Sequence, residues 1–462
     1  MMIGVLTSSL AWSQNGIDST QTVFKMQSFI DVVRSFHPVV KQAQIGVDMA
    51  KAARLAARGA FDPAFYLSTD QKTFDGKNYF IYTNPELKIP TWYGVEVKAG
   101  LENNGGLFTS DEISLGKTSY LGVSVPLAKN LVMDKRRAAL QQAKIFVQQS
   151  EADRLIQVND ILLDAYIAYL DWQSRYQFLQ VVRNAVEVNA ARFNLVKIAY
   201  RQGDRPAIDT VEALAQLQNF QFLEQEAMLR FRNAGVDLSN FLWLANDLPY
   251  QLPTNAVPEP QALVMNQPMP LEDELLQAAR QGHPKLQSTN FKLQSLEVER
   301  KLKFQSLLPT FNVKTNLLNK GYNVLKGVDA AFFENNYKFG IDLGMPLRLS
   351  EGRGEYRRAK LKLRDTRYDF SLLEVQIANK VRIYYNEIIG FRQQVNTMDA
   401  ALRNYQTLLR GEDVRFRNGE SSLFILNARE NKVLETQQKV VELIFKYSKS
   451  LVSAQWAAGQ LR

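Results

Sequence analysis

Tyr200-Arg201-Gln202-Gly203-Asp204 returns 216 residues later as Phe416-Arg417-Asn418-Gly419-Glu420. Residues 134–201, before the first copy, contain neither proline nor glycine, and Gly390 is the only glycine or proline in residues 355–410, before the second. A run of this kind predicts one very long helix, and the glycine after it predicts a tight left-handed turn. Two long helical hairpins therefore decide the fold.

The apolar residues of both runs are spaced alternately by three and four positions, as in helices packed along their length. In the first run they are Leu155, Val158, Leu162, Ala165, Tyr169, Trp172, Tyr176 and Leu179. In the second they are Ile377, Val381, Tyr384, Ile388, Phe391, Val395, Met398, Leu402, Tyr405 and Leu409. At about 1.5 Å per residue such helices extend roughly 100 Å, which predicts an elongated molecule.

The duplication extends beyond the turns. His37-Pro38 matches His283-Pro284, Pro63 matches Pro309, and Val125-Pro126-Leu127 matches Met345-Pro346-Leu347. A repeat of half the chain is too long for a solenoid unit of about 20–50 residues. The chain is therefore interpreted as two copies of a unit made of helix, strands, long helix, turn and helix.

The repeats set the predicted boundaries. The first repeat covers residues 14–245, with helices over about 24–59, 134–201 and 206–244 and strands within 63–127. The second covers 271–462, with helices over about 271–306, 354–417 and 421–460 and strands within 309–347. Residues 246–270 hold six of the fifteen prolines, which favours an extended linker. The short helices are expected to lie end to end beside the long one, with the strands at one end and the glycine turns at the other.

The predicted strands alternate apolar residues with small or charged ones. The apolar positions are Tyr93, Val95, Val97, Ala99, Leu101, Leu121, Val123, Val125, Phe311, Val313, Leu317, Tyr337, Phe339, Ile341, Leu343 and Met345. A half-buried sheet of a soluble protein shows the same alternation. However, aromatic residues gather near the strand ends, as in the girdles of outer-membrane barrels. On the strands alone, both interpretations stay open.

Composition leaves little for catalysis. The chain has no cysteine, and its two histidines are the matching pair before proline, where a helix-start or packing role is expected. No phosphate loop, nucleophile elbow or metal cluster appears, so the protein is predicted not to be an enzyme and to need no cofactor or metal. The net charge of +9 comes from 56 basic and 47 acidic residues that are well mixed, unlike a nucleic-acid-binding stripe.

Residues 1–13 resemble the end of a secretory signal peptide, because a short apolar run ends in Ala11-Trp12-Ser13. The mature chain is expected to begin near Gln14 and to be exported. No stretch reaches the roughly 18 consecutive apolar residues of a spanning helix. Contact with a membrane would therefore not involve a bundle of helices.

Taken in order, these features resemble the TolC family of outer-membrane efflux proteins over essentially the whole mature chain. The likeness rests on Val123-Ser124-Val125-Pro126-Leu127 and Ile341-Asp342-Leu343-Gly344-Met345-Pro346-Leu347 at the strand ends. It also rests on the two glycine turns, followed by Ile208-Asp209 and by Leu423-Phe424-Ile425-Leu426-Asn427-Ala428. Each motif is short, and their order, duplication and coiled-coil context are what make the likeness specific.

The resemblance implies a mainly helical fold with a β-barrel part. Three copies would each contribute four strands to a 12-stranded barrel in the bacterial outer membrane, continued by an α-helical coiled-coil tunnel into the periplasm. It also implies a passive exit duct of a tripartite efflux or type I secretion system, which receives substrate from an inner-membrane pump through a periplasmic adaptor (membrane fusion) protein. A closed barrel agrees with elementary physics, because lipid cannot satisfy open strand edges.

The resemblance also assigns roles at the turns. It places Arg201, Gly203, Asp204, Arg417, Gly419 and Glu420 at the periplasmic tip, where the adaptor docks. The family tends to ring the closed aperture with acidic residues, and Asp209 has this place in the first copy. The second copy has Phe424-Ile425-Leu426-Asn427 instead, so Phe424 and Ile425 are expected to form an apolar gate that closes by dewetting. The plainer alternatives are hairpin turns without a partner and a Phe424 that packs between helices.

Two questions stay open at this level. Residues 74–90 interrupt the first repeat, either as an extracellular hairpin or as part of a longer strand. The competing function is a periplasmic coiled-coil scaffold or adaptor without a membrane pore, in which the strands form an ordinary small sheet.

Overall fold

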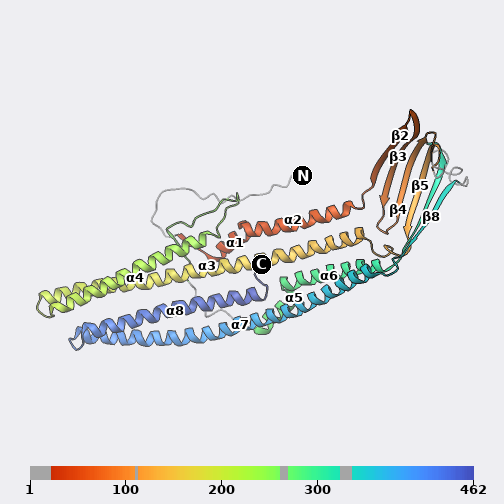
Figure 1. Ribbon diagram of the computed structural model, residues 1–462. Coiled ribbons are helices and arrows are strands. Elements are labelled where there is room, and N and C mark those ends of the chain that lie inside the picture. Colours follow the sequence, from red (N-terminus) through yellow and green to blue (C-terminus); the bar gives the residue numbers. More distant parts are fainter. Residues whose placement is uncertain (1–21, 110–112, 261–268, 323–335) are drawn as a thin grey trace, which may run out of the picture.

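The computed structural model describes residues 22–109, 113–260, 269–322 and 336–462. The expected signal segment 1–13 and the linker residues 261–268 lie outside the described residues. A long body of helices carries a sheet at one end and two helical turns at the other (Figure 1).

The elements follow the two repeats. The first contains β1 (Thr22–Phe24), α1 (Met26–Phe36), α2 (Pro38–Gly59), β2 (Ala64–Phe74), β3 (Lys77–Pro90), β4 (Glu96–Gly105), β5 (Gly116–Pro126), α3 (Lys135–Arg201) and α4 (Ala207–Ser239). After β6 (Ala256–Pro258), the second contains α5 (Glu272–Gly282), α6 (Pro284–Phe304), η2 (Gln305–Leu307), β7 (Thr310–Lys320), β8 (Tyr337–Gly344), α7 (Ser350–Arg417) and α8 (Leu423–Ala457). β6 pairs in parallel with β1, so the linker returns to the start of the first repeat.

The long helices α3 and α7, of 67 and 68 residues, extend along most of the body. α2 and α4 both pack against α3, and α6 and α8 both pack against α7. Figure 1 shows each pair arranged end to end along its long partner. α3 also contacts α6 and α8, which joins the repeats. One buried cluster forms midway along α3, where Tyr169 and Trp172 pack against Phe29 and Phe231.

Each helix expected before the strands is divided in two, which corrects the ranges 24–59 and 271–306. The breaks are at His37 and His283, whose ψ angles of 133° and 122° are extended. The proline that follows each histidine disfavours a helical conformation there. Each imidazole Nδ1 then accepts the backbone N–H two residues later, from Val39 at 3.3 Å and Lys285 at 3.1 Å. The expected helix-start role of both histidines is confirmed.

The end of α4 also differs from the sequence expectation. The helix ends at Ser239 rather than near residue 244. The N–H of Tyr250 donates to the carbonyl of Leu242 at 2.9 Å, so the chain already turns back at this point.

The strands beyond β1 and β6 form one antiparallel sheet in the order β2-β3-β4-β5-β7-β8. The described residues place six strands in the sheet of one chain, two more than the four that the resemblance implied each chain would contribute to a barrel. Residues 74–90 comprise the last residue of β2, a turn at Asp75-Gly76 and the strand β3, so β2 and β3 form a hairpin at the edge of the sheet. Both turn residues have positive φ, 51° and 70°, which is the conformation of a two-residue hairpin turn.

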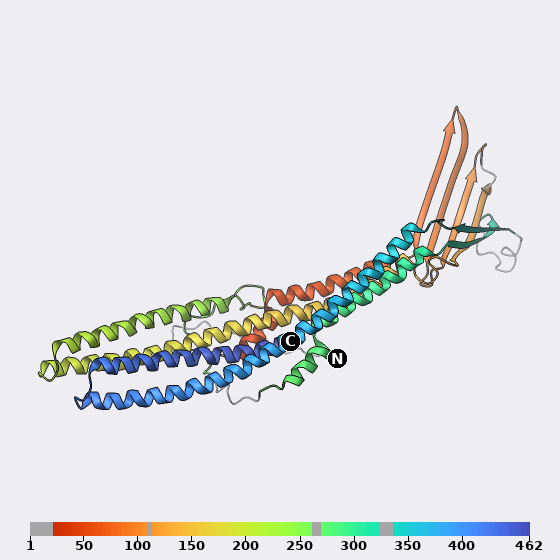
Figure 2. The ribbon, with the colours of Figure 1, turned by 60° about the horizontal axis from the view of Figure 1, so that its bottom comes forward.

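The sheet has one apolar face and one charged face. Apart from the bulge near Phe74, the strand pairs join odd with odd and even with even residue numbers. Odd positions include Phe65, Leu67, Leu87, Ile89, Val97, Leu121, Val123, Val313, Leu317, Phe339, Ile341 and Leu343. Even positions include Asp70, Glu86, Lys88, Glu96, Lys98, Glu102, Lys314, Lys338 and Asp342. In Figure 2 the strands of the second repeat turn away from those of the first, so the sheet is curved.

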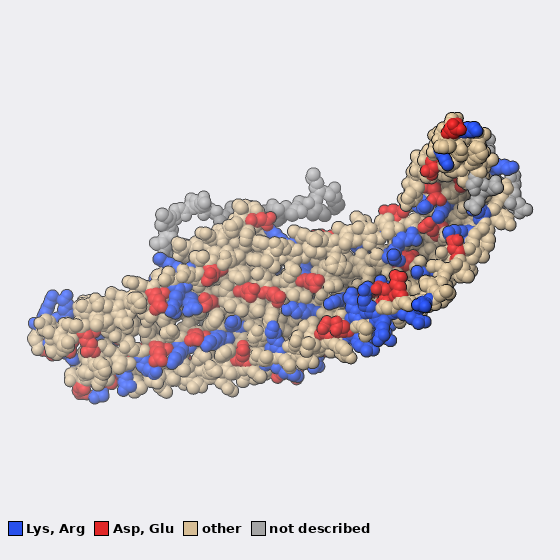
Figure 3. Space-filling model, in the orientation of Figure 1, with Lys and Arg blue, Asp and Glu red and all other residues tan. Residues whose placement is uncertain are grey.

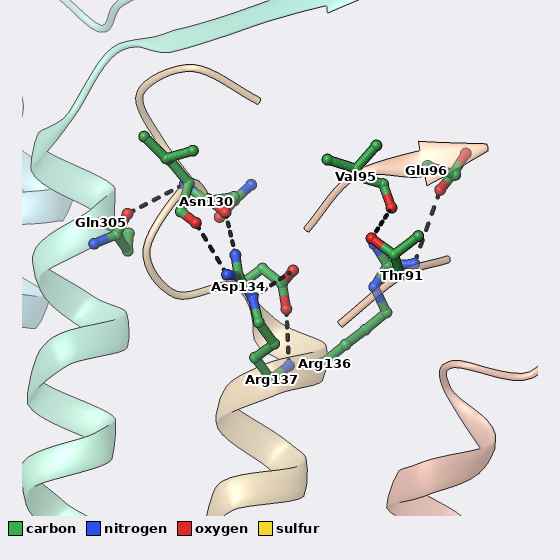
Figure 4. A network of polar contacts seen from close by, with 9 residues as sticks. Thr91, Val95, Glu96, Asn130, Asp134, Arg136, Arg137 and Gln305 are labelled. Carbon is green, nitrogen blue, oxygen red and sulfur yellow. Dashed lines mark hydrogen bonds and ion pairs between the residues drawn. The ribbon is translucent and has the colours of Figure 1, made fainter. Parts of the chain in front are cut away.

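Arg137 anchors the sheet to the helices (Figure 4). Its guanidinium donates to the carbonyls of Leu131, at 2.9 Å, and Asn130, and to the N-cap carboxylate of Asp134, at 3.2 Å. Gly94 has a φ of 83°, and a Cβ there would lie 2.8 Å from Nη2 of Arg137. The side chain of Gln305 accepts the N–H of Asn130 at 3.2 Å. The first turn of α3 is thereby connected to the loops and η2 beneath the sheet.

Along most of the helical body, the face seen in Figure 3 carries both signs of charge intermixed, and Lys and Arg gather near the end that joins the sheet. Within the described part of the chain, none of the helices combines the length and the apolar character that crossing a membrane requires.

Candidate functional site at the helical turns

The two turns at the far end of the body have the same backbone geometry. Gly203 and Gly419 have φ angles of 80° and 79°, and their N–H groups donate to carbonyls three residues earlier, at 3.0 and 3.1 Å. The N–H groups of Asp204 and Glu420 donate to carbonyls five residues earlier, at 3.0 and 2.9 Å. This is the Schellman motif, in which a left-handed residue lets the last helical carbonyls be satisfied. The predicted left-handed glycine is confirmed at both turns.

Arg205 connects the two turns. It follows the first turn, and its guanidinium donates to the backbone carbonyl of Phe416, at the end of α7, at 2.8 Å. The same group lies 4.1 Å from the centre of the Phe416 ring and 3.6 Å from the carboxylate of Asp209. One side chain thus joins the repeats by a hydrogen bond and a cation–π contact, and it also forms an ion pair within the first repeat.

Buried polar contacts lie next to the turns. Arg192 of α3 and Glu430 of α8 form an ion pair at 2.6 Å, with side chains only 12 and 9% exposed. Asn427 of α8 donates to Glu212 of α4 at 3.1 Å. Because a buried charge is destabilising without its partner, these contacts hold α8 against α3 and α4 of the first repeat.

The apolar residues at the turns divide into two groups. Phe416, Leu423 and Leu426 are buried in a cluster with Val196 and Ala213. Phe424, in contrast, is 72% exposed, and Ile425 is also exposed. Within a single chain, Phe424 therefore does not pack between helices.

Ile208 is a further exposed apolar residue, at the position of the first repeat that corresponds to Phe424. It is 66% exposed. At this matching position, just after the turn, each repeat thus presents an exposed apolar side chain.

The charged residues predicted for docking lie at the outer end of the body. Arg201, Asp204 and Glu420 are exposed, and Arg417 is exposed with an ion pair to Asp413 at 2.8 Å. Asp209, predicted at the aperture, is mostly buried and paired with Arg205. Exposed charges around a rigid turn are suited to recognition by another macromolecule.

Among the described residues, no group of three or more histidine, aspartate or glutamate side chains is placed to hold a metal ion.

Sequence reasoning missed Arg205 and the buried pair of Arg192 and Glu430. The contact of Arg205 with Phe416 joins residues 211 positions apart, and the buried pair joins residues 238 apart. The only local signal was the four-residue spacing of Arg205 and Asp209, which favours an ion pair on one helix face.

Comparisons with known proteins agree with this architecture. Residues 275–458 match the family model of the outer membrane efflux protein. The fold is similar to the CmeC outer membrane channel of Campylobacter jejuni, at 14% identity and a TM-score of 0.63 over 100% of this chain and 94% of that one. It is also similar to the outer membrane protein VceC of Vibrio cholerae, at 14% identity and a TM-score of 0.65 over 94 and 96% of the two chains.

A third similar structure is the open state of the MtrE outer membrane channel of Neisseria gonorrhoeae, at 12% identity and a TM-score of 0.65 over 97 and 94%. No curated protein sequence matches the chain. The family match agrees with the duplicated turns and strand ends from which the TolC-like resemblance was inferred. Residues 275–458 thus match the outer membrane efflux protein family, and the whole described chain has the fold of the outer membrane channels to which it is similar.

Proposed function

We propose that this protein is the trimeric outer-membrane channel of a tripartite efflux or type I secretion system. In this proposal, substrate passes from an inner-membrane pump and a periplasmic adaptor through the helical tunnel and the barrel to the exterior. The protein conducts passively, and the energy for transport comes from the pump.

The two-faced sheet carries this proposal. Its odd-numbered face is rich in apolar side chains and its even-numbered face is charged, over all six strands. Such a sheet suits a barrel wall with lipid outside and water inside. In the described residues of a single copy, β2 and β8 each have a neighbouring strand on one side only, and hydrocarbon cannot satisfy the backbone groups of the open side. Three copies that close one barrel remove these edges.

The turns are proposed as the adaptor-docking surface. Arg201, Gly203 and Asp204 form one half of it, and Arg417, Gly419 and Glu420 form the other. Both turns lie at the end of the body opposite the sheet (Figure 1). The two turns share the same Schellman geometry. This supports the proposal, because each copy then presents two similar rigid surfaces to a partner.

The gate is proposed to be mainly apolar. Phe424 and Ile425 are exposed in the single chain, and three copies would bring three such pairs together around the axis. Asp209 contributes less charge to the aperture than expected, because Arg205 pairs with it. Opening is then a change in helix packing at the turns, driven by partner contacts.

The mass of the detergent-extracted protein, measured by light scattering with the detergent subtracted, tests this function. We expect three copies, and ion conductance after reconstitution into planar bilayers. A stable monomer would contradict the channel. A protein that leaves membranes in carbonate without detergent would favour the periplasmic scaffold instead.

A further inference from the structure

The sheet of one chain ends in two strands that lack a second neighbour. In the described residues, β2 pairs only with β3, and β8 pairs only with β7. Almost every residue of both strands is exposed. Each edge therefore presents a row of backbone N–H and C=O groups for which lipid offers no partner.

We propose that β8 of one copy pairs with β2 of the next, so that all six strands of each chain line the pore. Three copies of six strands then enclose a barrel of eighteen strands. The inference rests on the trimeric channel proposed above, and it adds the composition of the pore wall and the interface between copies.

The directions of the two edge strands fit this pairing. All five strand pairs in the sheet are antiparallel, so β2 and β8, the first and sixth strands, run in opposite directions. A β8 strand and the β2 strand of the next copy can therefore form an antiparallel pair like the others. The resulting strand number is even, as in single-chain bacterial outer-membrane barrels.

The faces of the edge strands also match. On β2, Phe65 and Leu67 lie on the odd-numbered face, and Ile341 and Leu343 of β8 lie on the same face. On the opposite face, β2 has Asp70 and β8 has Asp342 and Lys338. Joining the two edges thus continues the apolar surface outside and the charged surface inside, with no change of side.

Side chains on the charged face connect the β2–β3 hairpin to the other strands of the sheet. Tyr120 of β5 lies over Gly100 of β4, where a Cβ would come within 2.5 Å of the ring. Its hydroxyl reaches across to donate to Glu86 of β3 at 2.5 Å. Lys88 pairs with Glu86 at 2.9 Å and lies 4.6 Å from the ring of Tyr66 on β2. Polar contacts therefore cross the charged face from β5 to β2. They support a barrel wall that includes the β2–β3 hairpin.

A wall of six strands per copy changes the width of the pore. Barrel diameter grows roughly in proportion to strand number, so six strands in place of four enlarge it by about half. Barrels of about 16–18 strands leave an aqueous channel. The outer-membrane part then imposes little size selection, and the narrowest point lies among the helices.

Disulfide crosslinking between copies tests the pairing, and the cysteine-free chain makes any introduced pair unique. Gly340→Cys on β8 is suitable because no atom lies within 4 Å of a Cβ at this position. It is combined in turn with Tyr66→Cys, Ser68→Cys and Asp70→Cys, which share its face on β2 and scan the register. The competing set combines Gly340→Cys with Glu96→Cys or Lys98→Cys on β4, the edge that would meet β8 if the hairpin lay outside the barrel.

Oxidation is carried out in isolated outer membranes, followed by denaturing electrophoresis without reductant. Glu102→Cys with Thr118→Cys, neighbours within one chain, shows that the oxidant reaches this face. We expect a covalent trimer with at least one β2–β8 pair and none with the β4–β8 pairs. Crosslinks between β4 and β8, or a trimeric mass without β2–β8 crosslinks, would overturn the six-strand wall and leave the trimer intact. A monomeric mass without any crosslink between copies would overturn the proposed channel itself.

Discussion

At the two turns, Gly203 and Gly419 combine a left-handed backbone with open space, since no atom lies within 4 Å of a Cβ at either position. Replacement by alanine therefore introduces no clash in the chain, and its effect is conformational. We expect Gly419→Ala to lower the free energy of unfolding by about 1 kcal/mol. Chemical denaturation of the detergent-extracted protein measures this difference.

Gly411 provides the matched control. It lies inside α7 without a left-handed φ, and the space around it is equally open. Gly411→Ala is expected to raise the free energy of unfolding by up to about 1 kcal/mol, because alanine is the better helix former. A loss of stability of the same size at both positions would contradict a specific left-handed requirement at the turn.

Arg205 is expected to hold the two turns together. Arg205→Ala removes its contacts with Phe416 and Asp209, each worth about 1 kcal/mol when partly buried. We therefore expect amide hydrogen exchange in residues 202–206 and 418–421 to accelerate about 30-fold, as measured by mass spectrometry.

Two variants test the origin of this effect. Arg417→Ala removes only an exposed ion pair and should leave exchange nearly unchanged. Arg205→Lys keeps the charge but loses the planar stacking on Phe416, so an intermediate effect is expected. Equal acceleration by Arg205→Ala and Arg417→Ala would rule out the proposed connection.

At the scale of elements, the paired helix breaks make stability depend on pH. Burial lowers the pKa of His283 to about 4, assisted by the charge of Lys285, and burial likewise lowers the pKa of His37. Between the ordinary value of 6.5 and about 4, the unfolded chain binds protons at His283 that the folded chain does not. The contribution of neutral His283 to the free energy of unfolding is therefore present above this pH window, and it is lost as the pH falls through the window.

Asparagine also caps helices but does not titrate. We expect the double variant His37→Asn, His283→Asn to lose less thermal stability than the original protein between about pH 7 and pH 4.5. Melting temperatures measured in the same detergent at both pH values provide the comparison. Equal losses in both proteins would show that carboxylates, not the histidines, dominate acid sensitivity.

At the scale of the whole molecule, the aperture is expected to require the side chains of three copies. Phe424 is 72% exposed in one chain, so its replacement by serine should leave the protomer folded. We expect Phe424→Ser to raise the resting conductance of reconstituted channels, because a polar ring is wetted more readily than an apolar one. Single-channel recording measures the change.

Phe222→Ser is the control, since Phe222 is similarly exposed on α4 but lies away from the turns. Its conductance should equal that of the original channel. Unchanged conductance in Phe424→Ser would remove Phe424 from the gate, and an equal rise in both variants would indicate general loosening of the helices.

Sequence patterns were reliable where the deciding interactions are local. The absence of glycine and proline from residues 134–201 predicted α3, and Gly203 and Gly419 predicted the turns. Each of these features depends on residues only a few positions apart. Alternation also predicted β4, β5, β7 and β8. The same reasoning joined α1 to α2, although the preference of a residue before proline was a local signal for the break at His37.

The sequence by itself therefore determined the long helices, their reversal and the two-faced character of four strands. Only the tertiary structure decided that the sheet has six strands, because alternation in β2 fades after Leu67 and Pro85 interrupts β3. These strands are established by hydrogen bonds to neighbours and by Tyr120 reaching Glu86, 34 positions away. Likewise, the hydrogen bond from Arg205 to the carbonyl of Phe416 forms only because packing brings segments 211 residues apart together. Local propensity cannot report contacts that only the folded chain creates.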